Sequence, residues 1–168
     1  MNKVVLRFFN VTFLLLLLFG LPINALARWT NDAHGAILSK STTGKNSEVV
    51  SLSLIISYYP ERGCTPEVSF ILMSGMKLGG GEKQWETSKT NKQLQIKIDG
   101  AMFTNTTKVT KYTNGFEYSM NAPPGFIKAM ENNPSSILVR LGEVIDNIDF
   151  SGAYGFSVAN NRAKDNCS

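Results

Sequence analysis

The chain has 168 residues, with 17 lysine and arginine side chains against 13 aspartate and glutamate side chains and a single histidine. Its net charge of +4 includes no run of like charges, which argues against nucleic acid as a partner because such binding depends on clustered cations. The single histidine, His34, excludes a metal site built on a histidine pair, and we expect it to be a solvated side chain.

The N-terminus has the pattern of a secretory signal peptide. A basic segment that ends at Arg7 is followed by an apolar run from Val11 to Leu21 and by the small-x-small cleavage pattern Ala25-Leu26-Ala27. The run is shorter than the roughly 20 residues that a membrane span needs, so we expect cleavage rather than anchoring. The sequence therefore predicts a signal peptide at residues 1–27 and one mature domain at residues 28–168, periplasmic or secreted and without a stable membrane span.

Cys64 and Cys167 are the only two cysteines. Exported proteins keep their cysteines oxidised, so a lone pair predicts one disulfide bond. The alternative is a reactive thiol or a metal site, which is disfavoured because two distant cysteines and one histidine supply few ligands. We therefore expect no metal and no cofactor.

The first half of the predicted mature chain has sequence patterns typical of β-strands. Trp29 to Ser41 is mildly apolar and predicts a first, poorly bounded strand. Glu48 to Tyr59 alternates apolar residues with serine, which predicts a half-buried strand. A turn at Pro60–Gly63 leads to a further alternating segment from Val68 to Ser74, so we expect these two strands to form a hairpin.

The second half contains clearer turns. Leu94, Ile96 and Ile98 alternate on one predicted strand that ends at Asp99-Gly100, a turn signal. Asn114-Gly115 lies between two threonine- and aromatic-rich arms and predicts a second hairpin.

Two short helices and one more strand are expected near the C-terminus. Prolines bound a helix that starts at Phe126, and Ile137–Leu141 predicts a strand. Ser151 is a candidate N-cap for a terminal helix, in which apolar residues recur at helical spacing: Phe156, Ala159 and Ala163. The total of seven or eight antiparallel strands predicts a mainly β protein, either a β-sandwich or a partly closed barrel.

This order of motifs resembles the small periplasmic proteins of the invasion-associated locus B type and the related accessory proteins of type VI secretion clusters. The matching features are Asp99-Gly100, Phe126-Ile127, Val139-Arg140, Phe150-Ser151-Gly152, and the positions of Trp29, Cys64 and Cys167. Cys64 departs from the family pattern because it follows a turn rather than a strand. The resemblance implies an envelope accessory or virulence-associated protein without known catalysis.

The candidate binding residues are few. Arg140 interrupts an apolar strand and is either a paired or anchoring side chain or, as we expect, an outward-facing one. Trp85, Tyr58 and Tyr59 could form a recognition patch, although most such aromatics in β proteins are core residues. Lys83 ends the charged, glycine-rich segment Gly79–Lys83, which could insert into a partner.

No catalytic motif is complete, because Gly155-Phe156-Ser157-Val158-Ala159 lacks the second glycine of a nucleophile elbow. The sequence therefore favours a non-enzymatic exported envelope protein that binds another envelope or secreted protein within a secretion or virulence system. The alternative is a secreted inhibitor or immunity protein that blocks a hydrolase.

Overall fold

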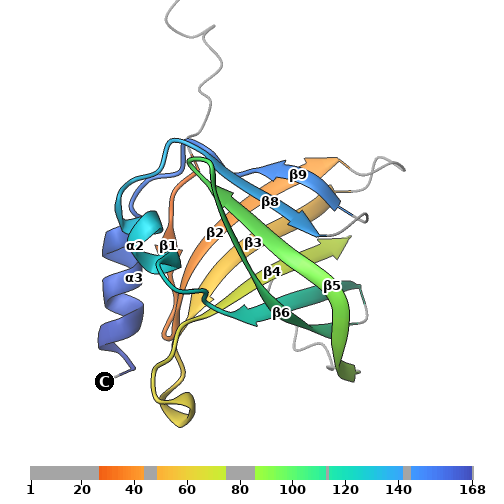
Figure 1. Ribbon diagram of the computed structural model, residues 1–168, viewed down its shortest axis with the longest axis horizontal. Helices are drawn as coiled ribbons and strands as arrows, with labels where there is room; N and C mark the ends of the chain where they lie inside the picture. Colours follow the sequence, from red (N-terminus) through yellow and green to blue (C-terminus); the bar gives the residue numbers. More distant parts are fainter. Residues whose placement is uncertain (1–26, 44–48, 75–85, 113, 142–144, 168) are drawn as a thin grey trace, which may run out of the picture.

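The computed structural model describes residues 27–43, 49–74, 86–112, 114–141 and 145–167. In these parts of the chain, nine strands form one continuous antiparallel sheet that curls into a half barrel, with two helices at one end (Figure 1). The mainly β fold class is confirmed, and the architecture is the partly closed barrel.

The elements have the following bounds. The N-terminal half contains β1 (Thr30–Asn31), β2 (Gly35–Thr43), β3 (Val49–Ser57), the 3-10 turn η1 (Pro60–Arg62) and β4 (Glu67–Ser74). The C-terminal half contains β5 (Glu86–Ile98), β6 (Ala101–Tyr112), β7 (Gly115–Asn121), α2 (Phe126–Glu131), β8 (Ile137–Leu141), β9 (Ile145–Asp149) and α3 (Phe156–Asp165). The strands lie in the order β1-β2-β3-β4-β7-β6-β5-β8-β9.

The core lies between the concave face of the sheet and the two helices. The alternating residues predicted to point inward are buried. Leu54, Phe70 and Ile96, for example, have no exposed surface. The helices close the core with one apolar face each, made of Phe126 and Met130 in α2 and of Phe156, Ala159 and Ala163 in α3. Apolar burial is the main favourable term in folding, so these faces fix where the helices lie.

Both predicted hairpins are confirmed, since β3 pairs with β4 and β6 pairs with β7. Asp99 and Gly100 have positive φ angles of 44° and 92°, as a tight two-residue turn between β5 and β6 requires. Gly115 starts β7 beside β4, where an added Cβ would lie only 2.1 Å from the carbonyl oxygen of Leu72. Glycine is therefore required at that position by close backbone approach rather than by its φ angle.

The two ends of the sheet approach one another along a seam that the sequence did not predict. The backbone N–H of Trp29 donates to the Tyr154 carbonyl at 2.9 Å, and the Tyr154 N–H donates to the Ala27 carbonyl at 3.2 Å. Farther along the seam, Lys40 Nζ on β2 donates to the carbonyl oxygen of Asp149 on β9 at 2.9 Å. These contacts close the half barrel without a continuous strand ladder.

Helix α3 is attached to the middle of the chain by two contacts. Cys64 and Cys167 form the predicted disulfide bond, with their Cα atoms 5.8 Å apart. The Tyr58 hydroxyl donates to the Asn160 side-chain oxygen at 2.7 Å inside the core. The bond closes a sequence separation of 103 residues, so it removes much of the chain entropy of the unfolded state.

Three details of the predicted architecture were wrong. Ser151 does not cap α3; the N-cap is Gly155, and the Ser151 hydroxyl accepts from the Ile137 N–H at 3.0 Å instead. Gly152 and Gly155 have φ angles of 75° and 82°, which keep the chain in a loop beyond Ser151. The expected first strand is two strands, β1 and β2, joined by a tight turn, and β9 is a strand where we expected only a connection.

Some expectations lie outside the described residues. These are the signal peptide up to Leu26, the turn around Gly44, and the segment that contains Gly79–Lys83 and Trp85. Among the described helices, none is long and apolar enough to cross a membrane.

Replacement of Cys167 by serine should lower the free energy of unfolding by roughly 2–5 kcal/mol, the usual cost of losing a native disulfide in a small secreted domain. Hydrogen exchange should show protection lost first in α3, because a short helix depends on its packing and its attachment. The wild-type protein treated with a dithiol reductant should show the same pattern. An unchanged melting temperature would contradict a stabilising role for the bond.

The seam should respond to acid. Hydrogen bonds from Ser151, aided by the charge of Lys40, hold the pKa of Asp149 below its usual range. A carboxyl group with a lowered folded-state pKa stabilises the fold above its unfolded pKa of about 4, and this contribution is lost as the pH falls through the folded pKa. Asp149→Asn should therefore lower the melting temperature by a few degrees at most at pH 7, since this exposed carboxylate is screened by water.

The difference in melting temperature between wild type and Asp149→Asn should shrink as the pH falls below about 4. A difference that is constant from pH 2 to pH 7 would show that the carboxylate charge has no role at the seam.

Candidate functional site

The face of β4, β7 and β6 opposite the core carries a row of polar side chains. Ser69 on β4 pairs with Ser119 on β7, and Ser119 pairs with Lys108 on β6. One step along the strands, Glu117 pairs with Thr110. Successive strand residues point to opposite faces, so these side chains lie opposite the buried Phe70 and Tyr118. A rigid strand scaffold thus presents a row of hydrogen-bonding groups.

Two adjoining hollows lie on this face, and together we call them the polar groove. The first has a volume of about 150 Å³, and the second about 320 Å³. They share walls formed by Glu67, Lys108 and Ser119. Asn105, Thr106, Met120 and Asn121 complete the first hollow, while Tyr59, Arg62, Thr110, Tyr112 and Glu117 complete the second.

Glu117 is the centre of the second hollow. Its carboxylate accepts a hydrogen bond from the Tyr112 hydroxyl at 2.7 Å and another from the Ser69 hydroxyl at 2.7 Å. Burial raises the pKa of Tyr112, and the hydrogen bond to Glu117 raises it further. Tyr112 therefore stays protonated and acts as a hydrogen-bond donor throughout the physiological pH range.

The turn η1 supplies the rim of the second hollow. The Arg62 guanidinium carbon lies 5.0 Å from the centroid of the Tyr59 ring, and the same guanidinium pairs with Glu67. Gly63 ends the turn in the left-handed conformation, with a φ of 64°, and Cys64 follows directly. The disulfide bond therefore anchors the rim of the groove.

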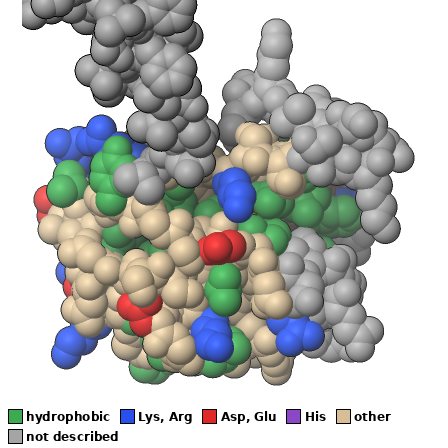
Figure 2. All heavy atoms as spheres, turned by 90° about the horizontal axis from the view of Figure 1, so that it is seen from above, with side chains coloured by type: hydrophobic (Ala, Val, Ile, Leu, Met, Phe, Trp, Pro, Cys, Tyr) green, Lys and Arg blue, Asp and Glu red, His purple; other side chains and the backbone are tan. Residues whose placement is uncertain are grey.

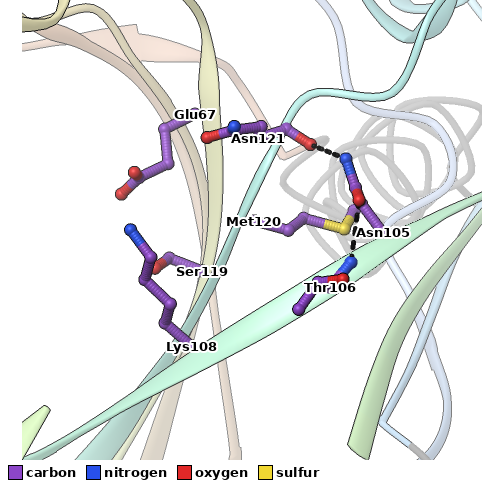
Figure 3. A pocket seen from close by; sticks show the side chains of 7 residues that line it. All are labelled: Glu67, Asn105, Thr106, Lys108, Ser119, Met120 and Asn121. Atoms are coloured by element: carbon purple, nitrogen blue, oxygen red, sulfur yellow. Dashed lines mark hydrogen bonds between the residues drawn. The ribbon is translucent and has the colours of Figure 1, made fainter. Parts of the chain in front are cut away.

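The first hollow marks the place where β6 separates from β7. Their pairing ends at Lys108 and Ser119, after which β6 continues beside β5 alone. Asn105 bridges the gap, with its side-chain amide donating to the Asn121 carbonyl at 3.2 Å. Figure 3 shows Lys108 and Glu67 pointing toward one another across the opening. Charged and amide groups are thus arranged around a break in the sheet.

The predicted binding residues do not form one site. Tyr59 lies at the rim of the polar groove. Tyr58 is 3% exposed and hydrogen-bonded to Asn160, so its place in a surface patch was wrong and its alternative as a core residue is confirmed. Arg140 is exposed on β8, on the outward side that we expected, and is not a wall residue of the groove. Trp85 and Lys83 lie outside the described residues.

The predicted binding residues did not include Arg62, Glu67, Lys108 or Glu117. Period-two alternation could have placed each of them on the outward face of its own strand or in the turn. Their convergence depends on the pairing of β4 with β7, which leaves the β5–β6 hairpin outside and is not visible from local pattern. An isolated glutamate on a strand looks like a solvated residue.

The groove offers hydrogen bonding rather than an evident reaction centre. Both carboxylates are engaged, Glu67 with Arg62 and Glu117 with two hydroxyl groups. His34 lies beside Tyr59 with ring centroids 6.2 Å apart and is not a wall residue. Within the described ranges, no group of three or more histidine, cysteine, aspartate or glutamate side chains could hold a metal ion.

Comparisons with family models, with curated proteins and with solved structures found no match. The resemblance to the invasion-associated locus B type and to type VI secretion accessory proteins therefore stays a prediction.

Glu117→Gln should lower the pKa of Tyr112 toward, but not to, its ordinary value, because the charge is removed while the burial remains. Titration of the tyrosine ring carbons by NMR above pH 9 measures this directly. Tyr118, whose pKa is raised by burial alone, is the internal control and should not change. Equal shifts at both tyrosines would point to a general loosening of the fold.

Proposed function

We propose that this protein is a non-catalytic, exported binding protein of the bacterial cell envelope that docks another envelope or secreted protein on its polar groove. The observation that carries the proposal is that the carboxylates of the groove are held in fixed positions. Glu67 and Glu117 are held in place by hydrogen bonds from strands and from a turn anchored by a disulfide bond. Groups fixed in this way recognise a partner at low ordering cost.

The shape and chemistry of the groove favour a protein partner. It combines two tyrosines, an arginine and a lysine with buried serine and threonine hydroxyls. Tyrosine and arginine are enriched in protein interfaces because they combine a large contact area with hydrogen bonding. The export signal and the disulfide bond direct the search to partners outside the cytoplasm.

The proposal also follows from the resemblance stated above, which implies an accessory of a secretion or virulence system. The alternative, an inhibitor of a hydrolase, depends on Gly79–Lys83, a segment outside the described residues. The two functions differ in the partner that the groove should bind.

A charge reversal in the groove tests the proposal. Lys108→Glu places a third carboxylate between Glu67 and Glu117, and like-charge contacts at an interface cost several kcal/mol. The tagged protein, exported in its native host, should capture a defined envelope or secreted protein after chemical cross-linking. Lys108→Glu should reduce that capture by about tenfold or more.

Lys128→Glu is the matched control, because Lys128 is an exposed lysine on α2 and is not a wall residue of the groove. It should capture as much partner as wild type. Equal capture by all three proteins would remove the groove from the proposal. Capture of a single hydrolase whose activity falls on binding would contradict the assembly accessory. It would support the alternative function, a hydrolase inhibitor.

A further inference from the structure

A second cavity lies at the helical end of the molecule, away from the polar groove. It has a volume of about 330 Å³ and lies between the segment that leads into β1 and the first two turns of α3. Figure 2 shows basic and hydrophobic side chains next to one another at this end of the molecule. The wall residues are Arg28, Trp29, Thr30, Asn31, Tyr154, Gly155, Val158, Ala159 and Arg162. We call this the α3 cavity.

The charged groups of the α3 cavity are all positive. Arg28 and Arg162 are exposed wall residues, and none of the wall residues is acidic. The cavity also contains the N-terminus of α3, where Gly155 is the N-cap, no side chain caps the helix, and the first turn has no acidic residue. The backbone N–H groups and the dipole of an uncapped helix N-terminus favour an anion.

Trp29 is the wall residue with a buried polar atom. The residue is only 3% exposed, and its indole Nε1 is buried without a hydrogen-bond partner among the described residues. A buried donor without a partner costs about 1–3 kcal/mol, so such groups are rare unless a ligand or water satisfies them. The ring packs edge-on against Phe156 at the start of α3, with centroids 4.9 Å apart, which fixes its position in the wall.

The remaining walls combine the polar side chains of Thr30 and Asn31 with exposed apolar surface. Tyr154 and Val158 are 50% and 58% exposed, which is unusual for large hydrophobic side chains, and they lie on either side of the helix N-terminus. The Arg28 guanidinium lies over the Tyr154 ring, 5.9 Å from its centroid. An anion with an apolar body would cover these two side chains and remove their surface from water.

Signal cleavage would add to the positive character of the cavity. The Tyr154 N–H donates to the carbonyl oxygen of Ala27. Cleavage after Ala27, which the sequence predicts, would remove that acceptor and leave the new α-ammonium group on Arg28. The processed protein would then have one more cation and one more available N–H beside the cavity.

We propose that the α3 cavity binds a small organic anion, a carboxylate attached to an aromatic or aliphatic body. The carboxylate lies at the N-terminus of α3 between Arg28 and Arg162, and the apolar body lies against Tyr154 and Val158. The cavity volume falls in the range of small-molecule sites, which is roughly 300–1,000 Å³. This proposal does not depend on the polar groove or on a protein partner.

Titration of the processed protein with benzoate, followed by NMR of the tryptophan indole N–H groups, tests the proposal. The Trp29 indole resonance should move with saturation as benzoate is added. Benzamide, which has the same shape without the charge, should bind at least roughly tenfold more weakly, because the ionised form makes the stronger hydrogen bonds. Sulfate, which lacks the apolar body, should also bind more weakly than benzoate.

Arg162→Gln should weaken benzoate binding by roughly tenfold, as expected for the loss of one charge-assisted hydrogen bond. Lys97→Gln is the matched control, since it removes one positive charge from an exposed position on β5 and should leave binding unchanged. Equal affinity for benzoate and benzamide, no saturable shift at Trp29, or wild-type affinity in Arg162→Gln would each overturn the proposal.

Discussion

The backbone pairing of Arg28 with Tyr154 is the contact on which the closed form of the sheet depends. It joins the segment before β1 to the segment after β9, so the first and last strands of the order approach one another. The Trp29 N–H donates to the Tyr154 carbonyl at 2.9 Å, and this hydrogen bond lies within the predicted mature chain. β1 and β9 are the edge strands of the sheet, and exposed edges invite pairing with other chains. The side-chain contact from Lys40 to Asp149 supports the same seam.

The seam also determines where α3 begins. Gly155 follows Tyr154 directly, with a φ of 82°, and turns the chain into the helix. The helix then buries Phe156, Ala159 and Ala163 in the core, where Phe156 meets Trp29 from the other side of the seam. Asn160 is buried as well, and its cost is offset because the Tyr58 hydroxyl donates to it. The position of α3 is thus fixed at its start by backbone pairing and at its end by the disulfide bond.

The sequence predicted those parts of the fold that depend on neighbouring residues. The strand that ends at Ile98, the turn at Asp99-Gly100 and the helix that starts at Phe126 are all present, because alternation, turn chemistry and proline act within a few residues. The disulfide bond was predicted from the two cysteines together with the expected export of the chain. Ser151 misled us because a serine before a helical pattern has the same appearance whether it caps the helix or, as here, accepts from a distant strand.

The functional surfaces could not be predicted in the same way. Glu67, Lys108 and Glu117 come together only because β7 pairs with both β4 and β6, a topology that no local pattern specifies. The α3 cavity depends on residues near both ends of the chain, and its buried indole donor is visible only when the packing is known. Surfaces made by long-range pairing are the part of a β protein that its periodicity does not encode.

The same covalent bond joins the elements that carry the two surfaces. Cys64 directly follows the turn whose Arg62 forms the rim of the polar groove, and Cys167 lies two residues beyond the end of α3, whose first turns line the second cavity. A turn and a short helix are the elements that would otherwise open most readily, since each makes few long-range backbone hydrogen bonds. By joining them to one another, the bond limits the motion of both at a single point. The disulfide bond is therefore placed where it stabilises the two proposed binding surfaces rather than the strands, which are already held by their ladders.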